Sequence, residues 1–462
     1  MKELIKHFFV YGIGATVGKF IALFLLPIYA SIFTPDDYGT LDFILALSSI
    51  LSVFGMIQIE TGMQRFYFEE PTEKDQESLV STAFTFALFC SVIISILSIL
   101  LIPLVSDYYF SSQYRIELFL SFLAILPNNL LVIMLIIFRY QKRSKIYVLI
   151  SLSQVLISAL SAIYAVKILD YGIYGVILTS TATSYLIFII SLFILLRNMS
   201  LLHFDKVKFR QMFAFGAPQF PARLGSISNV YVNRFVMISM LSVAAIGLYS
   251  VALKIASGMQ LIYTAFQLAW LPFLYELLKK ESHKTELVRI YKIVLALLSY
   301  IIVTSALFAK EVVLLLTNEQ YLESYRLVAV LTFYFALFIL KEVVDIGVNV
   351  TKQSKYTSYI YFVSVLINIF LLLFLTPTFK LYGVAFSLLI SNLVLFFLTL
   401  CVSVKLYPIH YPLFKSILIL GLTFFVVILS IVFDIDFKYR LAFFFIISIA
   451  AFFFYHKTIR VY

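Results

Sequence analysis

Charged residues are scarce in this sequence. They make up 13% of its 462 residues, whereas a soluble globular protein carries roughly 25%. The hydrophobic fraction is 62%, so the chain has too few polar side chains to cover a surface that faces water. We therefore expect an all-α integral membrane protein, because a helix satisfies its backbone hydrogen bonds within its own segment.

Cysteine and histidine are rare as well. Cys90 and Cys401 lie in apolar runs without a CxxC partner, and the five histidines lie between apolar runs or at their ends. The connections that we place outside the cell are too short to hold a catalytic domain. We therefore expect no disulfide, no metal site and no cofactor, and a protein that is not an enzyme.

The sequence consists instead of apolar segments from end to end. Each is close to the 20 residues that cross a bilayer as a helix, and together they predict about 14 transmembrane helices. The predicted spans are residues 8–33, 41–64, 79–104, 118–138, 147–167, 172–196, 213–240, 247–273, 289–309, 325–347, 358–377, 382–404, 412–432 and 439–457.

The net charge of +11 is spread over the short segments between these spans. This distribution argues against a nucleic-acid-binding module. With the N-terminus inside, the inner segments hold 22 Lys and Arg residues and the outer segments hold 7. The positive-inside rule then predicts a multi-pass protein with both termini in the cytoplasm.

An internal repeat with an offset of 204 to 210 residues divides the chain. Its landmark pairs are Phe9-Val10-Tyr11-Gly12 with Phe213-Ala214-Phe215-Gly216, Tyr38-Gly39 with Ile246-Gly247, and Ile173-Tyr174-Gly175-Val176 with Leu381-Tyr382-Gly383-Val384. Each repeat holds six predicted spans, so both enter the membrane from the same side, related by a pseudo-twofold axis along its normal. We expect six-helix lobes over 1–200 and 201–408 and two additional helices over 409–462.

Four basic residues lie deep in predicted spans, where a charge is costly and rarely kept without a use. They are Lys19, Arg223, Arg234 and Lys254. Arg223 and Arg234 are three helical turns apart and face the same way, with Asn229 and Asn233 near their stripe. No acid at comparable depth is an obvious partner, so we predict a cationic cavity that binds an anion. Snorkelling of Arg234 and Lys254, and structural hydrogen-bond networks around Lys19 and Arg223, are the alternatives.

Three acids are candidates for ion coupling. Asp42 and Glu60 lie nearer the ends of the second span, and could pair with Lys254 or Lys19 only if the lobes close. The third, Asp345, is near the inner end of the tenth span.

Two polar groups elsewhere in the spans have structural interpretations. We interpret Lys341, Glu342 and Asp345 together as an interfacial charge cluster. Pro127-Asn128-Asn129 predicts a break in the fourth span, with its polar groups turned toward protein rather than lipid.

Several short motifs follow one another along both halves of the chain. They are Tyr11-Gly12, Leu26-Pro27-Ile28-Tyr29, Asp37-Tyr38-Gly39, Arg65-Phe66-Tyr67-Phe68-Glu69, Phe215-Gly216-Ala217-Pro218, Asn233-Arg234 and Ile246-Gly247-Leu248-Tyr249-Ser250-Val251-Ala252. In their order and spacing these motifs resemble bacterial polysaccharide repeat-unit flippases of the multidrug/oligosaccharidyl-lipid/polysaccharide exporter superfamily. Relatives often have an acid where this chain has Asn233, so a proton-coupling role at that position is in doubt.

The resemblance implies that the protein moves an undecaprenyl-pyrophosphate-linked oligosaccharide between leaflets of the cytoplasmic (inner) membrane, by alternating access. The lipid-linked anionic oligosaccharide and membrane lipid are the implied partners, with a polysaccharide polymerase and a chain-length regulator as further candidates, in O-antigen or capsule synthesis. Two alternatives stay open. An ion-coupled multidrug exporter would require acidic residues deep in its spans. A membrane enzyme of polysaccharide assembly would require a large outer loop or a buried His or Asp.

Overall fold

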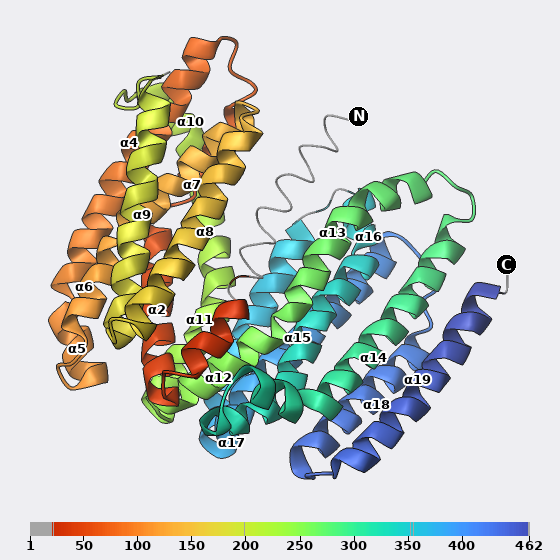
Figure 1. Ribbon diagram of the computed structural model, residues 1–462. Helices are drawn as coiled ribbons and strands as arrows, with labels where there is room; N and C mark the ends of the chain where they lie inside the picture. The colour runs from red at the N-terminus through yellow and green to blue at the C-terminus, as the bar shows by residue number, and fades with distance from the viewer. Residues whose placement is uncertain (1–20, 22, 198, 352, 354, 461–462) are drawn as a thin grey trace. The chain divides into compact units, whose positions relative to one another are not determined.

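The structure is a computed structural model that describes residues 21, 23–197, 199–351, 353 and 355–460 (Figure 1). Its regular structure is entirely helical over these residues, which confirms the all-α prediction. Ten helical segments of the described chain are long and apolar enough to cross a membrane. The chain is therefore a multi-pass membrane protein.

These ten segments follow the predicted spans. Nine correspond to one span each, and the tenth, α17 (Lys355–Leu406), joins the spans predicted at 358–377 and 382–404 through a kink at Lys380. The span predicted at 8–33 lies largely outside the described residues. Those predicted at 213–240 and 439–457 are helical in the structure but are not among the ten.

The chain divides into two compact units, and the boundary in the sequence lies between Ile238 and Ser239. The helices of the first unit are α2 (Pro35–Phe54), α3 (Ile59–Phe66), α4 (Glu73–Leu100), α5 (Ile102–Phe110), α6 (Arg115–Leu123), α7 (Ile125–Tyr140), α8 (Ser144–Lys167), α9 (Gly172–Leu196), α10 (Lys206–Gly216), the short η1 (Ala217–Gln219) and most of α11 (Phe220–Met240). The division expected at residues 200 and 408 follows the sequence repeat rather than packing, and it stays a prediction.

The second unit is built around α15. Its helices are α12 (Val243–Ala256), α13 (Gly258–Leu277), α14 (His283–Leu316), η2 (Glu319–Ser324), α15 (Tyr325–Val344), α16 (Ile346–Thr351), α17, α18 (Leu413–Val432) and α19 (Phe437–Arg460). Nearly every residue of α15 is buried, because α12, α13, α14 and α17 all pack against it.

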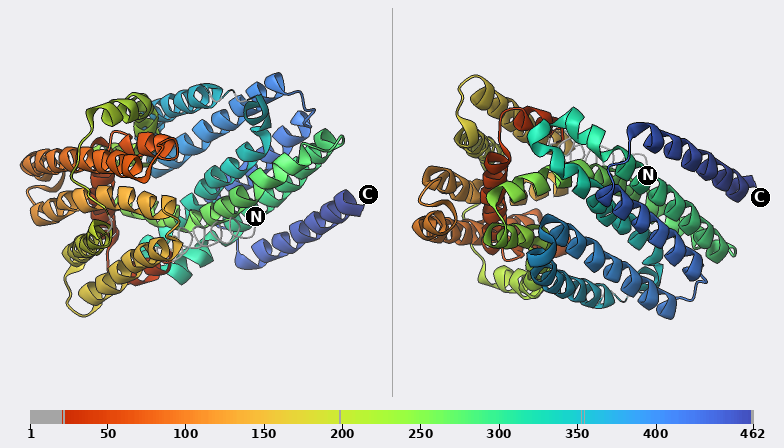
Figure 2. Two further views of the ribbon diagram at one scale, coloured as in Figure 1. Left: turned by 90° about the horizontal axis from the view of Figure 1, so that it is seen from above. Right: turned by 90° about the horizontal axis from the view of Figure 1, so that it is seen from below.

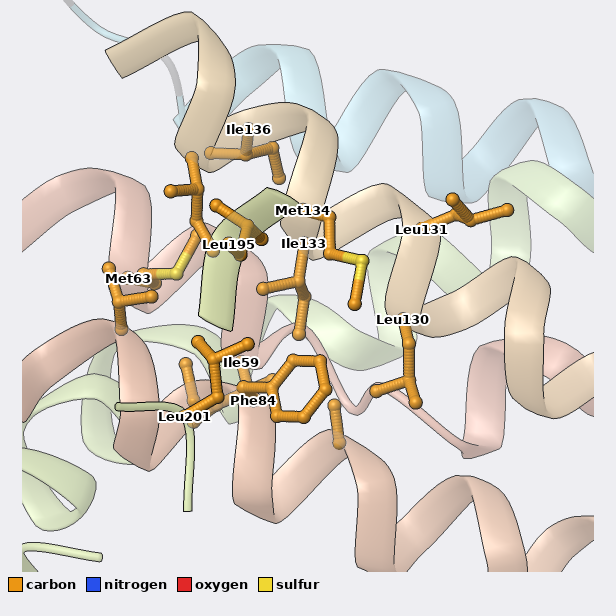
Figure 3. Close-up of a cluster of buried hydrophobic side chains, with 14 of the residues drawn as sticks. Ile59, Met63, Phe84, Leu130, Leu131, Ile133, Met134, Ile136, Leu195 and Leu201 are labelled. Atoms are coloured by element: carbon orange, nitrogen blue, oxygen red, sulfur yellow. The ribbon is translucent and has the colours of Figure 1, made fainter. Parts of the chain in front are cut away.

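Apolar side chains of α3, α4, α7 and α9 form the core of the first unit. Figure 3 shows Ile59, Phe84 and Ile133 close together, with Leu195 and Leu201 beside them. Within a membrane, such contacts stabilise a protein by close packing rather than by removing surface from water.

The segment between the two repeats is attached to the start of α4. Ser81 and His203 exchange two hydrogen bonds, from His203 N to Ser81 Oγ at 2.7 Å and from Ser81 Oγ to His203 O at 3.0 Å. Lys208 at the start of α10 lies 3.1 Å from Glu70 and 3.2 Å from Asp75. These contacts explain why α10 and α11, which follow the first repeat in sequence, pack with its helices.

The helices α2 and α12 begin in the same way, as expected of repeat-related segments. Thr34 caps α2 by accepting a hydrogen bond from Asp37 N, and Ser242 caps α12 by accepting one from Ala245 N. The landmark glycines Gly39 and Gly247 follow their caps at the same distance and are both buried.

The last two helices pack on α14, and α19 lies beside α14 in every view (Figures 1 and 2). Arg440 of α19 donates two hydrogen bonds to the carboxylate of Glu311, at 2.7 and 2.9 Å. Lys310 lies 2.9 Å from Asp434 in the connection between α18 and α19. This hydrogen bond from Lys310 holds the pKa of Asp434 below its usual range.

Candidate functional site

The second predicted span is broken between α2 and α3. Ile57 and Gln58 at the break have φ of 46° and 60°, in the left-handed region that costs a side-chain-bearing residue roughly 1–2 kcal/mol. Such strain persists only where neighbouring structure requires it, and it clusters at functional sites.

Polar side chains of α4 and α7 surround this break. Asn129 accepts a hydrogen bond from Ser52 Oγ at 2.6 Å and donates to Ser52 O and Ser91 Oγ, both at 3.0 Å. Ser91 in turn donates to the carbonyl of Gly55 at 3.3 Å. The irregular backbone is thus satisfied by protein rather than exposed to lipid. The prediction that the polar groups of Pro127-Asn128-Asn129 face protein is confirmed for Asn129, whereas Asn128 is exposed. The break in the fourth span lies slightly earlier, at Ala124.

The seventh predicted span is broken as well, at η1, and the two breaks face each other. A methyl group at Gly216 would overlap the carbonyl oxygen of Gln58, so the two backbones touch there. On the far side of the breaks, the rings of Phe54 and Phe220 meet with centroids 5.4 Å apart. A pair of discontinuous helices at one level is typical of substrate and ion sites in transporters.

The helices α2 and α11 run antiparallel from this point. Phe220 at the start of α11 contacts Phe54 at the end of α2. Phe235, farther along α11, contacts Phe43, nearer the start of α2, with ring centroids 5.1 Å apart. The end of the predicted stripe that holds Arg234 therefore lies beside α2.

Arg234 lies on this stripe and forms an ion pair with Asp42. Its Nε donates to Asp42 Oδ2 at 2.8 Å, and the Arg234 side chain is 3% exposed while that of Asp42 is 26% exposed. The guanidinium also lies 5.6 Å from the ring centroid of Tyr231. The prediction that the deep cations lack an acid partner is therefore wrong for Arg234. Pairing of Asp42 with Lys254 or Lys19 on closure of the lobes stays a prediction, and antiparallel packing brings Asp42 to Arg234 within one unit.

Arg223 lies on α11 close to the facing breaks, and its side chain is exposed. Its charge acts on Glu60 in the first turn of α3. One carboxylate oxygen of Glu60 is buried and has no hydrogen-bond partner among the described residues. Arg223 is thus an accessible cation in the neighbourhood of Glu60 rather than a member of a buried ion pair like that of Arg234 and Asp42.

The other predicted site residues are distributed as follows. Lys19 lies outside the described residues, and so does the side chain of Asn229. Asn233 is fully buried next to Arg234. Lys254 is half-buried in the last turn of α12, in the second unit, where the helix dipole favours a cation.

The cluster at the end of α15 is buried. Lys341 is 5% exposed and Asp345 is 6% exposed, and the Lys341 Nζ lies 2.5 Å from Asp345 Oδ2. The prediction of an interfacial charge cluster concerns depth in the membrane and stays a prediction, while the structure shows that the cluster is buried within the protein. Position in the span could not reveal this, because the covering groups come from α13 and α17.

Two contributions to these sites were missed in the sequence. Gln58 was not noted because a helix break without Gly or Pro at its centre has no simple signal. Tyr263 of α13, whose hydroxyl donates to Glu342 Oε1 at 3.1 Å, was missed because one tyrosine among 31 does not stand out.

A family model described as "Polysaccharide biosynthesis protein" matches residues 28–326. This match covers more than half of the chain. The chain belongs to the polysaccharide biosynthesis protein family. Its match includes Asp42, Glu60, Arg223, Arg234 and Lys254, whereas the cluster around Lys341 lies beyond it. Among curated proteins, none matches this sequence.

Solved structures show which fold this family member has. A lipid II flippase, MurJ, in an inward closed conformation is 15% identical with a TM-score of 0.67, over 98% of this chain and 100% of that one. The MATE multidrug transporter DinF-BH, solved as a complex, is 17% identical with a TM-score of 0.58, over 87% and 95%. An inward-facing multidrug resistance MATE family transporter of the MOP superfamily has a TM-score of 0.57 at 12% identity, over 88% and 96%. The protein therefore has the two-lobed fold of flippases and transporters of this superfamily.

Proposed function

We propose that this protein is a flippase that moves an undecaprenyl-pyrophosphate-linked oligosaccharide repeat unit from the inner to the outer leaflet of the cytoplasmic membrane. The observation that carries the proposal is the family match, which names polysaccharide biosynthesis and covers the facing broken helices and three of the four predicted cations. The similarity of the whole chain to a lipid II flippase supports it, because lipid II in that protein's name is a lipid-linked cargo.

The charge on the broken helix suits such a cargo. A pyrophosphate link carries about two negative charges, and an exposed guanidinium binds phosphoryl oxygens through paired hydrogen bonds. Arg223 is exposed on α11 beside the helix break, and an exposed cation within a membrane protein needs water or an anion beside it.

The repeat supplies a second cation in the equivalent position. The offset of 204 that aligns Gly12 with Gly216 also aligns Lys19 with Arg223. Each repeat therefore carries one basic residue at the same distance beyond its landmark glycine. Two cations in equivalent positions of the two sequence repeats suit one pyrophosphate that is handed over by alternating access.

The mechanism needs no covalent chemistry. The oligosaccharide and pyrophosphate cross through a hydrated, cationic path, while the prenyl chain stays in lipid. Arg234 is neutralised by Asp42 and holds α11 against α2, so we assign it a positioning role and assign phosphate contact first to Arg223. A polymerase and a chain-length regulator would act on the delivered product.

An ion-coupled multidrug exporter is the second candidate. The fold similarity to the two MATE transporters favours it. The basic character of Arg223 and of its repeat partner argues against it, since cationic drugs need acidic sites.

Reconstitution can separate the two functions. Purified protein in liposomes that hold a fluorescent undecaprenyl-pyrophosphate oligosaccharide in the inner leaflet should expose the label to an external quencher. Protein-free liposomes and the Arg223→Ala variant should not. Uptake of a cationic rhodamine dye without movement of the lipid-linked sugar would overturn the flippase assignment.

A further inference from the structure

A cavity of about 200 Å³ lies between α14, α18 and α19 in the second unit. Most of its wall is apolar and extends inward from the helix ends. Val426 lies six residues before the end of α18 and Phe443 six residues after the start of α19, which is about 9 Å along each helix. Such a wall favours an apolar chain. Its apolar lining residues are Ala306, Leu307, Val426, Leu429, Phe433 and Phe443.

The end of the cavity near the α18–α19 connection is charged. Lys310 Nζ donates to both carboxylate oxygens of Asp434, at 2.9 and 3.2 Å. The side chain of Asp434 is 63% exposed and that of Lys310 is 28% exposed. An ammonium group has three donors, and a carboxylate accepts more than two hydrogen bonds. Both groups therefore keep hydrogen-bonding capacity for a ligand.

Arg440, the other cation of the lining, is already engaged in the protein. It donates to both carboxylate oxygens of Glu311 and, at 2.6 Å, to the carbonyl of Leu307. Its side chain is only 13% exposed. A bidentate pair of this kind is neutral as a unit, so Arg440 shapes the wall of the cavity.

Arg326 is a further cation whose charge acts on Asp434. It lies 3.8 Å from Glu323 and donates to the hydroxyls of Tyr325 and Tyr382. Of the charged groups that line the cavity in the described chain, Lys310 and Asp434 are thus left to meet a ligand, one of each sign.

A headgroup that matches both charges carries a phosphate and a primary ammonium group. The phosphate can accept from Lys310, and the ammonium can donate to Asp434. A purely anionic headgroup would bring a second negative charge next to Asp434. A quaternary ammonium group has no N–H to donate to the carboxylate.

We propose that this cavity binds a phospholipid with a phosphoethanolamine headgroup. One acyl chain lies between α14, α18 and α19, and the headgroup lies on Lys310 and Asp434. In the predicted orientation this end of α14 is external, so the lipid belongs to the outer leaflet. The lipid fills space between α14 and the last two helices, which pack on it (Figures 1 and 2). The site lies within the second unit and does not depend on the proposed flippase function.

Native mass spectrometry of the purified protein tests the headgroup. The probes are phosphatidylethanolamine, phosphatidylglycerol and phosphatidylcholine with identical acyl chains, added to delipidated protein in detergent. Phosphatidylethanolamine should bind about tenfold more tightly than the other two lipids. This is the difference expected from one additional hydrogen bond between charged groups.

Asp434→Asn keeps the shape of the side chain but removes its charge, which leaves Lys310 unbalanced. The preference should then pass from phosphatidylethanolamine to phosphatidylglycerol. Asp436→Asn is the matched control, because Asp436 is exposed in the same connection and does not line the cavity. This control variant should bind the three lipids in the same order as the wild-type protein.

Ser430→Phe tests the acyl chain, since Ser430 lines the cavity. The added ring should weaken binding of all three lipids to a similar extent and leave their order unchanged. Equal binding of the three lipids by the wild-type protein, or an unchanged preference in Asp434→Asn, overturns the proposal. So does undecaprenyl phosphate that binds more tightly than phosphatidylethanolamine and is lost in Ser430→Phe, because the cavity would then hold a prenyl chain. Should Ser430→Phe fail to fold, Asp434→Asn and its control still decide.

Discussion

The Nε of Arg234 lies 2.8 Å from Asp42 Oδ2, although 192 residues separate the two in the chain. The pair joins α2, near the start of the family match, to α11, which follows the first sequence repeat. Both helices are broken at the level of Gln58 and Gly216, and Asp42 and Arg234 lie well beyond these breaks. We infer that the pair fixes the register of α11 on α2 and so determines where Arg223 is presented.

We expect Arg234→Ala to lower the free energy of unfolding by about 3 kcal/mol. This is the lower end of the range for breaking a buried ion pair, because Asp42 keeps partial contact with solvent. Thermal unfolding of detergent-purified protein measures it. The double variant Asp42→Asn, Arg234→Gln should recover much of the loss. Arg65→Ala, which breaks an exposed pair with Glu69, should cost less than about 1 kcal/mol. Equal losses in Arg234→Ala and Arg65→Ala would contradict the structural role of the buried pair.

We expect Arg223→Ala to abolish surface glycan while the protein accumulates normally. Its side chain is exposed, so removing it leaves no cavity. Arg223→Lys should be partly active if charge alone matters, and inactive if paired hydrogen bonds to phosphate are needed. Arg210→Ala removes an exposed arginine of α10 and should leave glycan display unchanged. A normal amount of surface glycan in cells with a stable Arg223→Ala protein would show that Arg223 does not contact the substrate.

We expect Gly216→Ala to destabilise the first unit by about 1–3 kcal/mol, the usual cost of overpacking. The added methyl group would overlap the Gln58 carbonyl and force the two broken helices apart. Gly421→Ala is the control, because nothing lies within 4 Å of a Cβ at Gly421. Alanine has the higher helix propensity, so this second variant should be neutral or slightly stabilising. The fraction of folded protein, measured at increasing temperature, should fall earlier for Gly216→Ala than for Gly421→Ala. Equal unfolding curves for the two variants would contradict the close contact.

We predict that both termini are cytoplasmic. Reporter fusions after Lys145 and after Arg210 should read cytoplasmic, and a fusion near Gln113 should read external, as the lysine and arginine distribution indicates. An external signal after Arg210 would contradict an even number of spans in the first repeat.

We expect the membrane potential to supply part of the drive for flipping. Two negative charges that cross the whole field gain roughly 4–5 kcal/mol at 100 mV, as an upper bound. A potassium–valinomycin potential at fixed pH and zero sodium gradient should change the extent of flipping in liposomes. Flipping that ignores this potential and follows only an imposed pH or sodium gradient would show this hypothesis to be wrong.

The sequence alone determined the class of protein and the positions of most helices. Apolar length is sufficient for this, because a bilayer requires about 20 apolar residues per span and tolerates few charges. The repeat was visible for a similar local reason. Caps such as Thr34 and Ser242, and buried glycines such as Gly39 and Gly247, serve the same local structure in both halves.

Only the tertiary structure decided which charges meet. Arg234 and Lys341 are both basic residues in long apolar runs. Lys341 has its partners Glu342 and Asp345 beside it in sequence, whereas no acid near Arg234 in sequence pairs with it. Antiparallel packing of α11 on α2 gave Arg234 an acid from far along the chain, whereas burial beneath α13 and α17 made the Lys341 cluster an interior site. The sequence could count the deep charges and place Lys341 beside its acids, but the pairing of Arg234 with Asp42 depends on helix register, and register is set by contacts between segments far apart in the chain.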